Sequence, residues 1–252
     1  MNNLLSQAYY SFIQSNVIRF FDVNTPLNGI PYGFKFLHVN NLDKQLTNFF
    51  TPKLKATISR RCTYFLKQPD ISYACSLILP HVHQLVRSYL GPTASLDFVK
   101  LSILYPEDHT NTSGIPHHDS VGHRLKLFVP LRIPGTVVTP TKYVTGSNKT
   151  KWKTYVNPLR ADNTRIDRFW MTANEVELVA PCDYVYIFDT NGIHWGVYNT
   201  LAKPRVHLVM EFSNIKSYFI KGDIGHRITC NTDTRKCLAE NKLIPQHLIL
   251  SS

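Results

Sequence analysis

The feature that most constrains the fold of this chain is a series of short apolar runs in its second half. The runs are rich in Val, Ile, Leu, Tyr and Phe and alternate with turn-forming residues. They occupy residues 96–105, 124–132, 176–179, 184–188, 194–198 and 206–212. Short strands punctuated in this way are typical of β-sandwiches and barrels. The sequence therefore predicts a mainly β domain over residues 96–215.

The preceding part of the chain, residues 1–95, is expected to be a helical or mixed region that packs on this domain. Apolar residues recur at helical spacing from residue 4 to residue 21. A second helix is expected to begin at its N-cap Asp70 and to end just before Gly91. Pro80 lies inside this second stretch and predicts a kink or a division into two shorter helices.

The β domain is expected to carry a polar insertion over residues 139–174 and to be followed by a C-terminal extension over residues 216–252. The insertion contains seven Lys or Arg residues against two Asp residues. It is either a solvated surface loop or a basic segment that shapes access of a substrate, because long loops on a rigid scaffold often carry function.

Charge and cysteine content limit the class of protein. The chain has 28 Lys and Arg against 17 Asp and Glu, a formal net charge of +11, which favours anionic partners such as nucleic acid, acidic metabolites or acidic proteins. No apolar run approaches the roughly 20 residues of a membrane-spanning helix, and no signal-peptide pattern is found at the N-terminus.

The cysteines are Cys62, Cys75, Cys182, Cys230 and Cys237. Without a Cys-x-x-Cys pair they do not suggest a disulfide framework or a zinc knuckle, although the last two could pair, and we expect a cytoplasmic protein.

Three side chains form the pattern that carries the chemistry. Asp119 follows His117 by two residues, and residues i and i+2 of a strand face the same side. His194 begins a later run. Two imidazoles and one carboxylate form the facial triad of non-haem Fe(II) oxygenases, and the lack of Cys ligands argues against a closed zinc site. His118 is an alternative ligand, although the spacing favours His117.

Each member of this pattern has an ordinary explanation when it is taken alone. A His-x-Asp pair arises by chance in a chain with 11 His, and His194 by itself would pass for a strand-end histidine. Arg205, eleven residues beyond His194, would pass for a surface charge. Their occurrence together, each placed at a predicted strand, favours a metal site.

The order His-x-Asp, distal His and following Arg resembles that of the Fe(II)- and 2-oxoglutarate-dependent dioxygenases. The resemblance runs from about Leu96 to Phe212 and implies a double-stranded β-helix, a distorted jelly roll. The sequence is most similar to the aspartyl/asparaginyl β-hydroxylase group and its proline-hydroxylase relatives. The similar segments are residues 117–127, 194–199 and 205–212.

The resemblance implies roles for individual residues. His117, Asp119 and His194 would bind Fe(II). Arg205 would hold the distal carboxylate of the co-substrate 2-oxoglutarate through two parallel guanidinium donors. Tyr105 precedes the His-x-Asp pair at a spacing that many relatives use for a tyrosine that contacts the same carboxylate.

The strand after the first ligand departs from the pattern of the hydroxylases. They often place Arg and His where this chain has Lys126 and Phe128. Lys126 is therefore a secondary candidate for contact with the co-substrate, and Arg124 would either share this role or pair with a surface acid. Phe128 and Trp195 either form apolar walls of the site or belong to the core.

The activity implied by the resemblance is hydroxylation of an amino-acid or peptidyl side chain with dioxygen and 2-oxoglutarate. One alternative is a nucleic-acid oxygenase of the same superfamily, but the second Arg that such relatives carry is missing from the residues that follow Arg205. A cupin isomerase or metal-binding cupin would favour His-x-His followed by Glu. A further alternative is a non-catalytic jelly-roll binding module.

Overall fold

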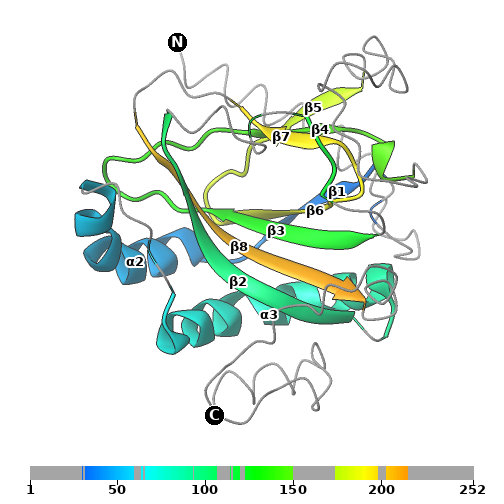
Figure 1. Ribbon diagram of the computed structural model, residues 1–252. Helices are drawn as coiled ribbons and strands as arrows, with labels where there is room; N and C mark the ends of the chain where they lie inside the picture. Colours follow the sequence, from blue (N-terminus) through cyan, green and yellow to red (C-terminus); the bar gives the residue numbers. More distant parts are fainter. Residues whose placement is uncertain are drawn as a thin grey trace.

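The computed structural model describes residues 30, 32–59, 64, 66–92, 94–106, 114, 116–119, 123–149, 174–197 and 203–214. These residues form two antiparallel β-sheets and two long helices, and the helices cover the outer face of the larger sheet (Figure 1). The helix expected over residues 4–21, the C-terminal extension and Cys62, Cys230 and Cys237 lie outside the described residues. No helix in the described ranges has both the length and the apolarity needed to cross a membrane.

Apart from β4 and β5, strands that lie side by side in the two sheets are not consecutive in sequence. The larger sheet has the order β1-β6-β3-β8-β2, and the smaller has the order β5-β4-β7. The strands are β1 (Phe34–His38), β2 (Ala94–Leu104), β3 (Arg124–Pro130), β4 (Thr141–Val144), β5 (Glu175–Leu178), β6 (Tyr184–Asp189), β7 (His194–Gly196) and β8 (Arg205–Asn214). Because the chain passes repeatedly from one sheet to the other, the fold is a double-stranded β-helix, as the sequence predicted.

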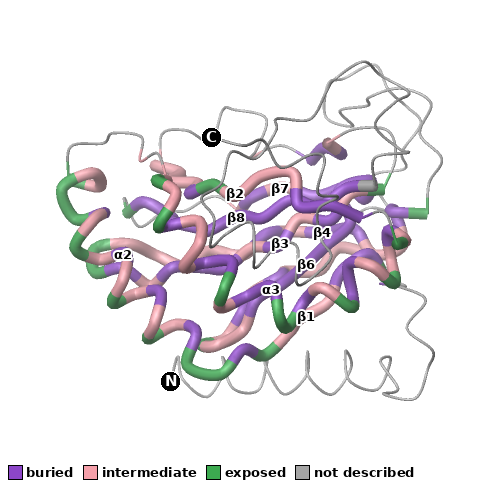
Figure 2. Tube along the Cα trace, turned by 90° about the horizontal axis from the view of Figure 1, so that it is seen from below, coloured by how far each residue is buried: buried purple, intermediate pink, exposed green. Residues whose placement is uncertain are grey.

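The larger sheet has two faces of different character because side chains alternate along each strand. On β3, Leu125, Leu127 and Val129 are fully buried in the apolar core that the sheet shares with the helices. The intervening residues of β3, which include Lys126 and Phe128, face the smaller sheet. Figure 2 shows the burial concentrated along the central strands. This inner face carries the polar groups of the candidate site.

The helices are α2 (Leu42–Ser59) and α3 (Gln68–Leu90). The N-cap of α3 is Lys67, so the prediction that Asp70 caps this helix from outside was wrong. Asp70 lies in the first turn, and its carboxylate accepts the backbone N–H of Lys67 at 2.9 Å. Pro80 is contained in one continuous helix rather than dividing it in two. Gly91 ends the helix as expected, with a φ of 94° and its N–H donating to the carbonyl of Arg87 at 2.9 Å.

The described start of the expected insertion belongs to the smaller sheet. β4 and the 3₁₀ turn Ser147–Lys149 both lie within residues 139–174, so this part is not a loop. Tyr143 of β4 is fully buried and packs edge-on against Phe34 and Phe188 of the larger sheet. β4 also pairs with β5 and β7, so this stretch is part of the sheet. Residues 150–173 lie outside the described part of the chain.

Tyr143 closes the space between the sheets next to the turn that leads to His194. Its hydroxyl donates to the carbonyl of Asp189 at 3.0 Å. A Cβ atom added at Gly192 would lie 1.8 Å from this hydroxyl, and one added at Gly33 would lie 2.2 Å from it. A side chain at either Gly33 or Gly192 would therefore clash with the ring of Tyr143.

We predict that Gly192→Ala destabilises the protein, because the added methyl group meets the fixed ring of Tyr143. Overpacking of this kind costs about 1–3 kcal/mol of unfolding free energy. Urea denaturation of the two proteins measures the difference. The double variant Gly192→Ala, Tyr143→Phe, which removes the clashing hydroxyl, should recover part of the loss. An unchanged unfolding midpoint in the single variant would contradict this packing.

Candidate metal centre

The backbone brings the three predicted ligands together. His117 and His194 form an isolated antiparallel bridge and exchange two hydrogen bonds, of 3.1 and 2.8 Å. The backbone N–H of Asp119 donates to the carbonyl of Thr190 at 3.1 Å. His117 and Asp119 therefore do not lie on one continuous strand, contrary to the expectation from their spacing. They converge because the segment that carries them is hydrogen-bonded to the turn between β6 and β7.

A second set of hydrogen bonds holds that turn in place. The carboxylate of Asp189, which is fully buried, accepts the Tyr89 hydroxyl at 2.5 Å and the backbone N–H of Asn191 at 2.9 Å. It also pairs with Nδ1 of His123 at 2.5 Å. Tyr89 belongs to α3, so this carboxylate ties the helical layer to the turn from which His194 extends.

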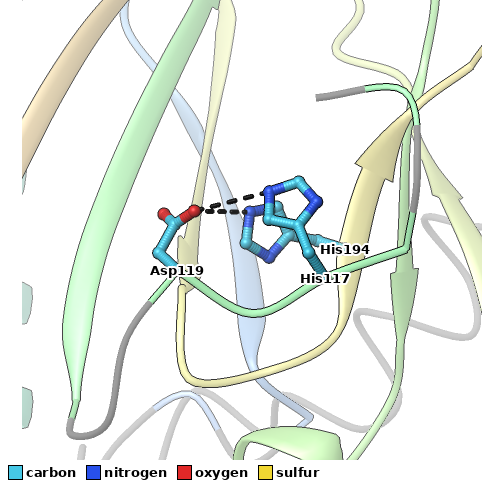
Figure 3. A group of neighbouring side chains, drawn as sticks. All are labelled: His117, Asp119 and His194. Carbon is cyan, nitrogen blue, oxygen red and sulfur yellow. Dashed lines mark ion pairs between the residues drawn. The ribbon is translucent and has the colours of Figure 1, made fainter. Parts of the chain in front are cut away.

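The three side chains point at a common position (Figure 3). Oδ1 of Asp119 lies 3.4 Å from Nε2 of His117 and 3.7 Å from Nε2 of His194. The candidate ligand atoms all lie within 4.8 Å of one another. Two imidazole nitrogens and one carboxylate oxygen so arranged can share one metal ion. This donor set, without thiolates, suits a non-haem Fe(II) ion with open positions.

The protonation of His194 suits a ligand. Its Nδ1 lies 2.9 Å from the carbonyl oxygen of Gly192, which can only accept, so Nδ1 carries the proton and Nε2 keeps its lone pair. Burial lowers the pKa of His194 to about 3, against the opposing effect of Asp119. The imidazole is therefore neutral at pH 7, which is the form that binds metals.

The two oxygens of Asp119 have different neighbours. Oδ1 faces the imidazoles, whereas Oδ2 forms an ion pair with Nζ of Lys126. Burial acts to raise the pKa of the Asp119 carboxyl, but the charge of Lys126 and the imidazoles hold it well below its usual value. Asp119 is thus a carboxylate at neutral pH.

Lys126 belongs to a longer row of charges on the inner face. Oε2 of Glu211 lies 3.6 Å from its Nζ, and Oε1 of Glu211 accepts a hydrogen bond from Arg124 at 2.6 Å. Glu211 is 2% exposed, so Arg124 pairs with a buried acid and not with a surface acid. The sequence made Lys126 a secondary candidate for contact with the co-substrate. In the structure it lies between the carboxylates of Asp119 and Glu211.

Arg205, the predicted anion ligand, is a buried cation without a counterion in the described part of the chain. It is 7% exposed, and its guanidinium donates to the carbonyl of Pro140 at 3.2 Å. No carboxylate of a described residue lies within ion-pair distance of it. A buried charge without a partner is costly, which favours an anionic ligand. The guanidinium also packs on Gly196, where an added Cβ would lie 2.8 Å from Nη2.

His207 is the residue of this region that our sequence analysis missed. It is 1% exposed, and its Nε2 has no hydrogen-bond partner among the described residues. Burial, with a smaller contribution from Arg205, lowers its pKa well below the usual value, so the ring is neutral. It follows Arg205 by two residues on β8 and so faces the same side. The spacing of two residues from Arg205 was the sequence feature that could have identified His207 as a site residue.

The other predicted residues fall near the site in different ways. Tyr105 follows β2 one residue after Leu104, which pairs with Arg205 across the strands. Phe128 packs against His207, with the ring centroids 5.2 Å apart, and therefore lines the inner face. Trp195 packs with the small cluster around Val144 and Ile193 on the smaller sheet.

Comparisons with known proteins agree with the architecture. No known family profile matches the sequence, and no curated protein matches it significantly. The solved structure of the epimerase SnoN in complex with Fe3+, alpha ketoglutarate and nogalamycin RO aligns over 73% of this chain and 80% of its own, with a TM-score of 0.51 and 14% identity. This chain shares its fold. A second structure, of the non-heme alpha ketoglutarate dependent epimerase SnoN from nogalamycin biosynthesis, covers 73% and 79% with a TM-score of 0.51 and 15% identity.

We predict that His117→Gln abolishes stoichiometric Fe(II) binding, because it removes one of three ligands from the site. His118→Gln is the matched control, since His118 is also buried but lies outside the cluster of ligand atoms. Elemental analysis after anaerobic loading and desalting measures the bound iron. The reverse result, in which His118→Gln loses the metal and His117→Gln keeps it, would reassign the ligand.

Proposed function

We propose that this protein is a non-haem Fe(II)- and 2-oxoglutarate-dependent dioxygenase. The observation that carries the proposal is the convergence of His117, Asp119 and His194, on the same inner surface as the buried Arg205, which has no counterion among the described residues. The first three residues would hold the metal, and Arg205 would hold the co-substrate. When bound, iron and 2-oxoglutarate supply an oxidant that can attack an unactivated C–H bond.

The spacing along β7 supports a bridge between the two parts of the site. His194 and Gly196 are two residues apart and so face the same side, about 7 Å apart at the usual strand rise. The guanidinium of Arg205 packs on Gly196. A small dicarboxylate could therefore reach the metal position with one end and the guanidinium with the other. The neutral His207 beside Arg205 offers a further hydrogen-bonding group to the same carboxylate.

The protein's own residues have defined tasks in this proposal. His194 is held by Gly192 in the tautomer that exposes Nε2, and Asp119 stays ionised. Phe128, Tyr186 and Phe188 form an aromatic wall on the inner face that would exclude water from the site. Burial raises the pKa of Tyr186 to about 12, so this wall stays uncharged. A dry, neutral wall strengthens the attraction between a carboxylate and Arg205.

For the prime substrate we propose an amino-acid or peptidyl side chain, as in the aspartyl/asparaginyl and proline hydroxylases that the sequence resembles. The net charge of +11 supports an acidic substrate, and the Lys- and Arg-rich stretch of residues 139–174 would contribute to its attraction. This stretch lies in the chain between the two segments that carry the candidate ligands, residues 117–119 and His194.

The direct test of the proposed activity is succinate formation from 2-oxoglutarate under air with Fe(II), followed by mass spectrometry. We predict that Arg205→Ala weakens 2-oxoglutarate binding by roughly 2–5 kcal/mol, because a charge-assisted pair in a buried site is lost. Iron content should not change. Lys53→Met is the control, since Lys53 pairs with Asp70 in the helical layer. Equal 2-oxoglutarate affinities of Arg205→Ala and the wild type would contradict the assignment of Arg205 as the co-substrate ligand.

We predict that coupled turnover with acidic peptides falls as ionic strength rises, because salt screens long-range attraction. The triple variant Lys149→Glu, Lys151→Glu, Lys153→Glu should lower the ratio of coupled to uncoupled turnover and remove its salt dependence. Neutral peptides of equal length are the comparison. If acidic and neutral peptides respond alike in both proteins, the basic stretch plays no part in substrate selection.

A further inference from the structure

The ion pair between Lys126 and Asp119 suggests a function that the metal ligands alone do not explain. A carboxylate can bind a metal through one oxygen or through both. Here Oδ1 of Asp119 faces both imidazoles, at 3.4 and 3.7 Å, while Oδ2 contacts the ammonium of Lys126. The second oxygen is therefore already occupied by a group of the protein.

Lys126 is itself fixed in this position. It lies directly opposite Glu211 in the register of β3 and β8, and Oε2 of Glu211 is 3.6 Å from its Nζ. Glu211 is held in turn by Arg124, which lies two residues before Lys126 on the same face of β3. The side chains of Lys126 and Glu211 are 17% and 3% exposed, so little water competes for these contacts.

The row Asp119–Lys126–Glu211–Arg124 contains two acids and two bases, so its formal charges cancel. Removing Lys126 alone would leave the carboxylates of Asp119 and Glu211 near one another. Arg124 and Lys100 would then be the neighbouring cations. Asp119 would then be free to turn its Oδ2 toward a bound metal. Outer partners of metal ligands commonly control ligand orientation in this way.

We propose that Lys126 is a positioning residue that keeps Asp119 a one-oxygen ligand and so preserves three open coordination positions on the metal. This inference rests on the proposed function, which needs those positions for the co-substrate and dioxygen. A two-oxygen Asp119 would take one of them. Lys126 thus acts through Asp119, with which it pairs in the structure.

The experiment measures the water molecules on a bound metal without any co-substrate. Mn(II) is loaded into the wild type, and the water-proton relaxivity of the protein-bound ion is recorded. A facial triad on a six-coordinate ion leaves about three water ligands. In Lys126→Met the second oxygen of Asp119 should replace one of them, leaving about two waters and lowering the inner-sphere relaxivity by about a third.

Three further variants make the result specific. Lys126→Arg keeps a cationic donor for Oδ2 and should retain the wild-type relaxivity. Lys126→Met with Glu211→Gln removes the uncompensated acid, so it reports on Asp119 even if the single variant folds poorly, and it should match the lowered value. Lys142→Met is the control, because Lys142 pairs with Glu175 on the smaller sheet. Circular dichroism checks the fold of each protein.

The outcomes separate this inference from the proposed function. Equal relaxivity in the wild type, in Lys126→Met and in the double variant would overturn the positioning role. A loss in Lys126→Arg as large as that in Lys126→Met would overturn it as well. A Lys126 that only contacted the co-substrate would change 2-oxoglutarate affinity and leave the Mn(II) value untouched. A wild type that binds no metal would instead defeat the proposed function itself.

Discussion

The candidate site depends on one backbone contact, the antiparallel bridge between His117 and His194. Two hydrogen bonds fix these residues side by side, and a third, from Asp119 to Thr190, brings the carboxylate to the same point. The ligand geometry is thus set by main-chain pairing, which the buried carboxylate of Asp189 anchors to α3 through Tyr89. Changes far from the ligands, in the helical layer or the turn, should therefore affect the site.

The inner face of the larger sheet divides its polar residues between two tasks. At one end, Arg205 and His207 are buried without a described anionic partner, which makes this end suitable for a small anion. At the other end, Lys126 and Glu211 neutralise one another beside Asp119. The apolar rings between the two ends keep the local dielectric constant low. Electrostatic interactions at both ends are therefore stronger than they would be in water.

The sequence predicted six strand-forming segments from their local apolar pattern, but it predicted neither β1 nor β4. Its candidate ligands His117, Asp119 and His194 lie together in the structure, whereas it missed His207. Runs rich in Val, Ile, Leu and Phe indicated β3 and β8, and the spacing of two residues singled out His117 with Asp119.

Sequence-based prediction failed where contacts between residues far apart in the chain determine the local structure. Tyr143 of β4, in the stretch expected to be an insertion, packs against Phe34 and Phe188 of the other sheet. The partner of Lys126 is Asp119, seven positions away in a separate segment. The capping of α3 by Asp70 from inside the first turn also depended on where the helix began.

The proposed co-substrate site is tested most directly by titrating the Fe(II)-loaded wild-type protein with 2-oxoglutarate under anaerobic conditions. The visible absorption spectrum is recorded at each addition. Chelation of the metal by the keto acid at a site with two adjacent open positions should produce a weak, saturable charge-transfer band with one co-substrate per iron. Neither component alone should give it. A protein that holds one iron per chain but develops no band at saturating 2-oxoglutarate would contradict the assignment of this site to co-substrate-dependent oxygen chemistry.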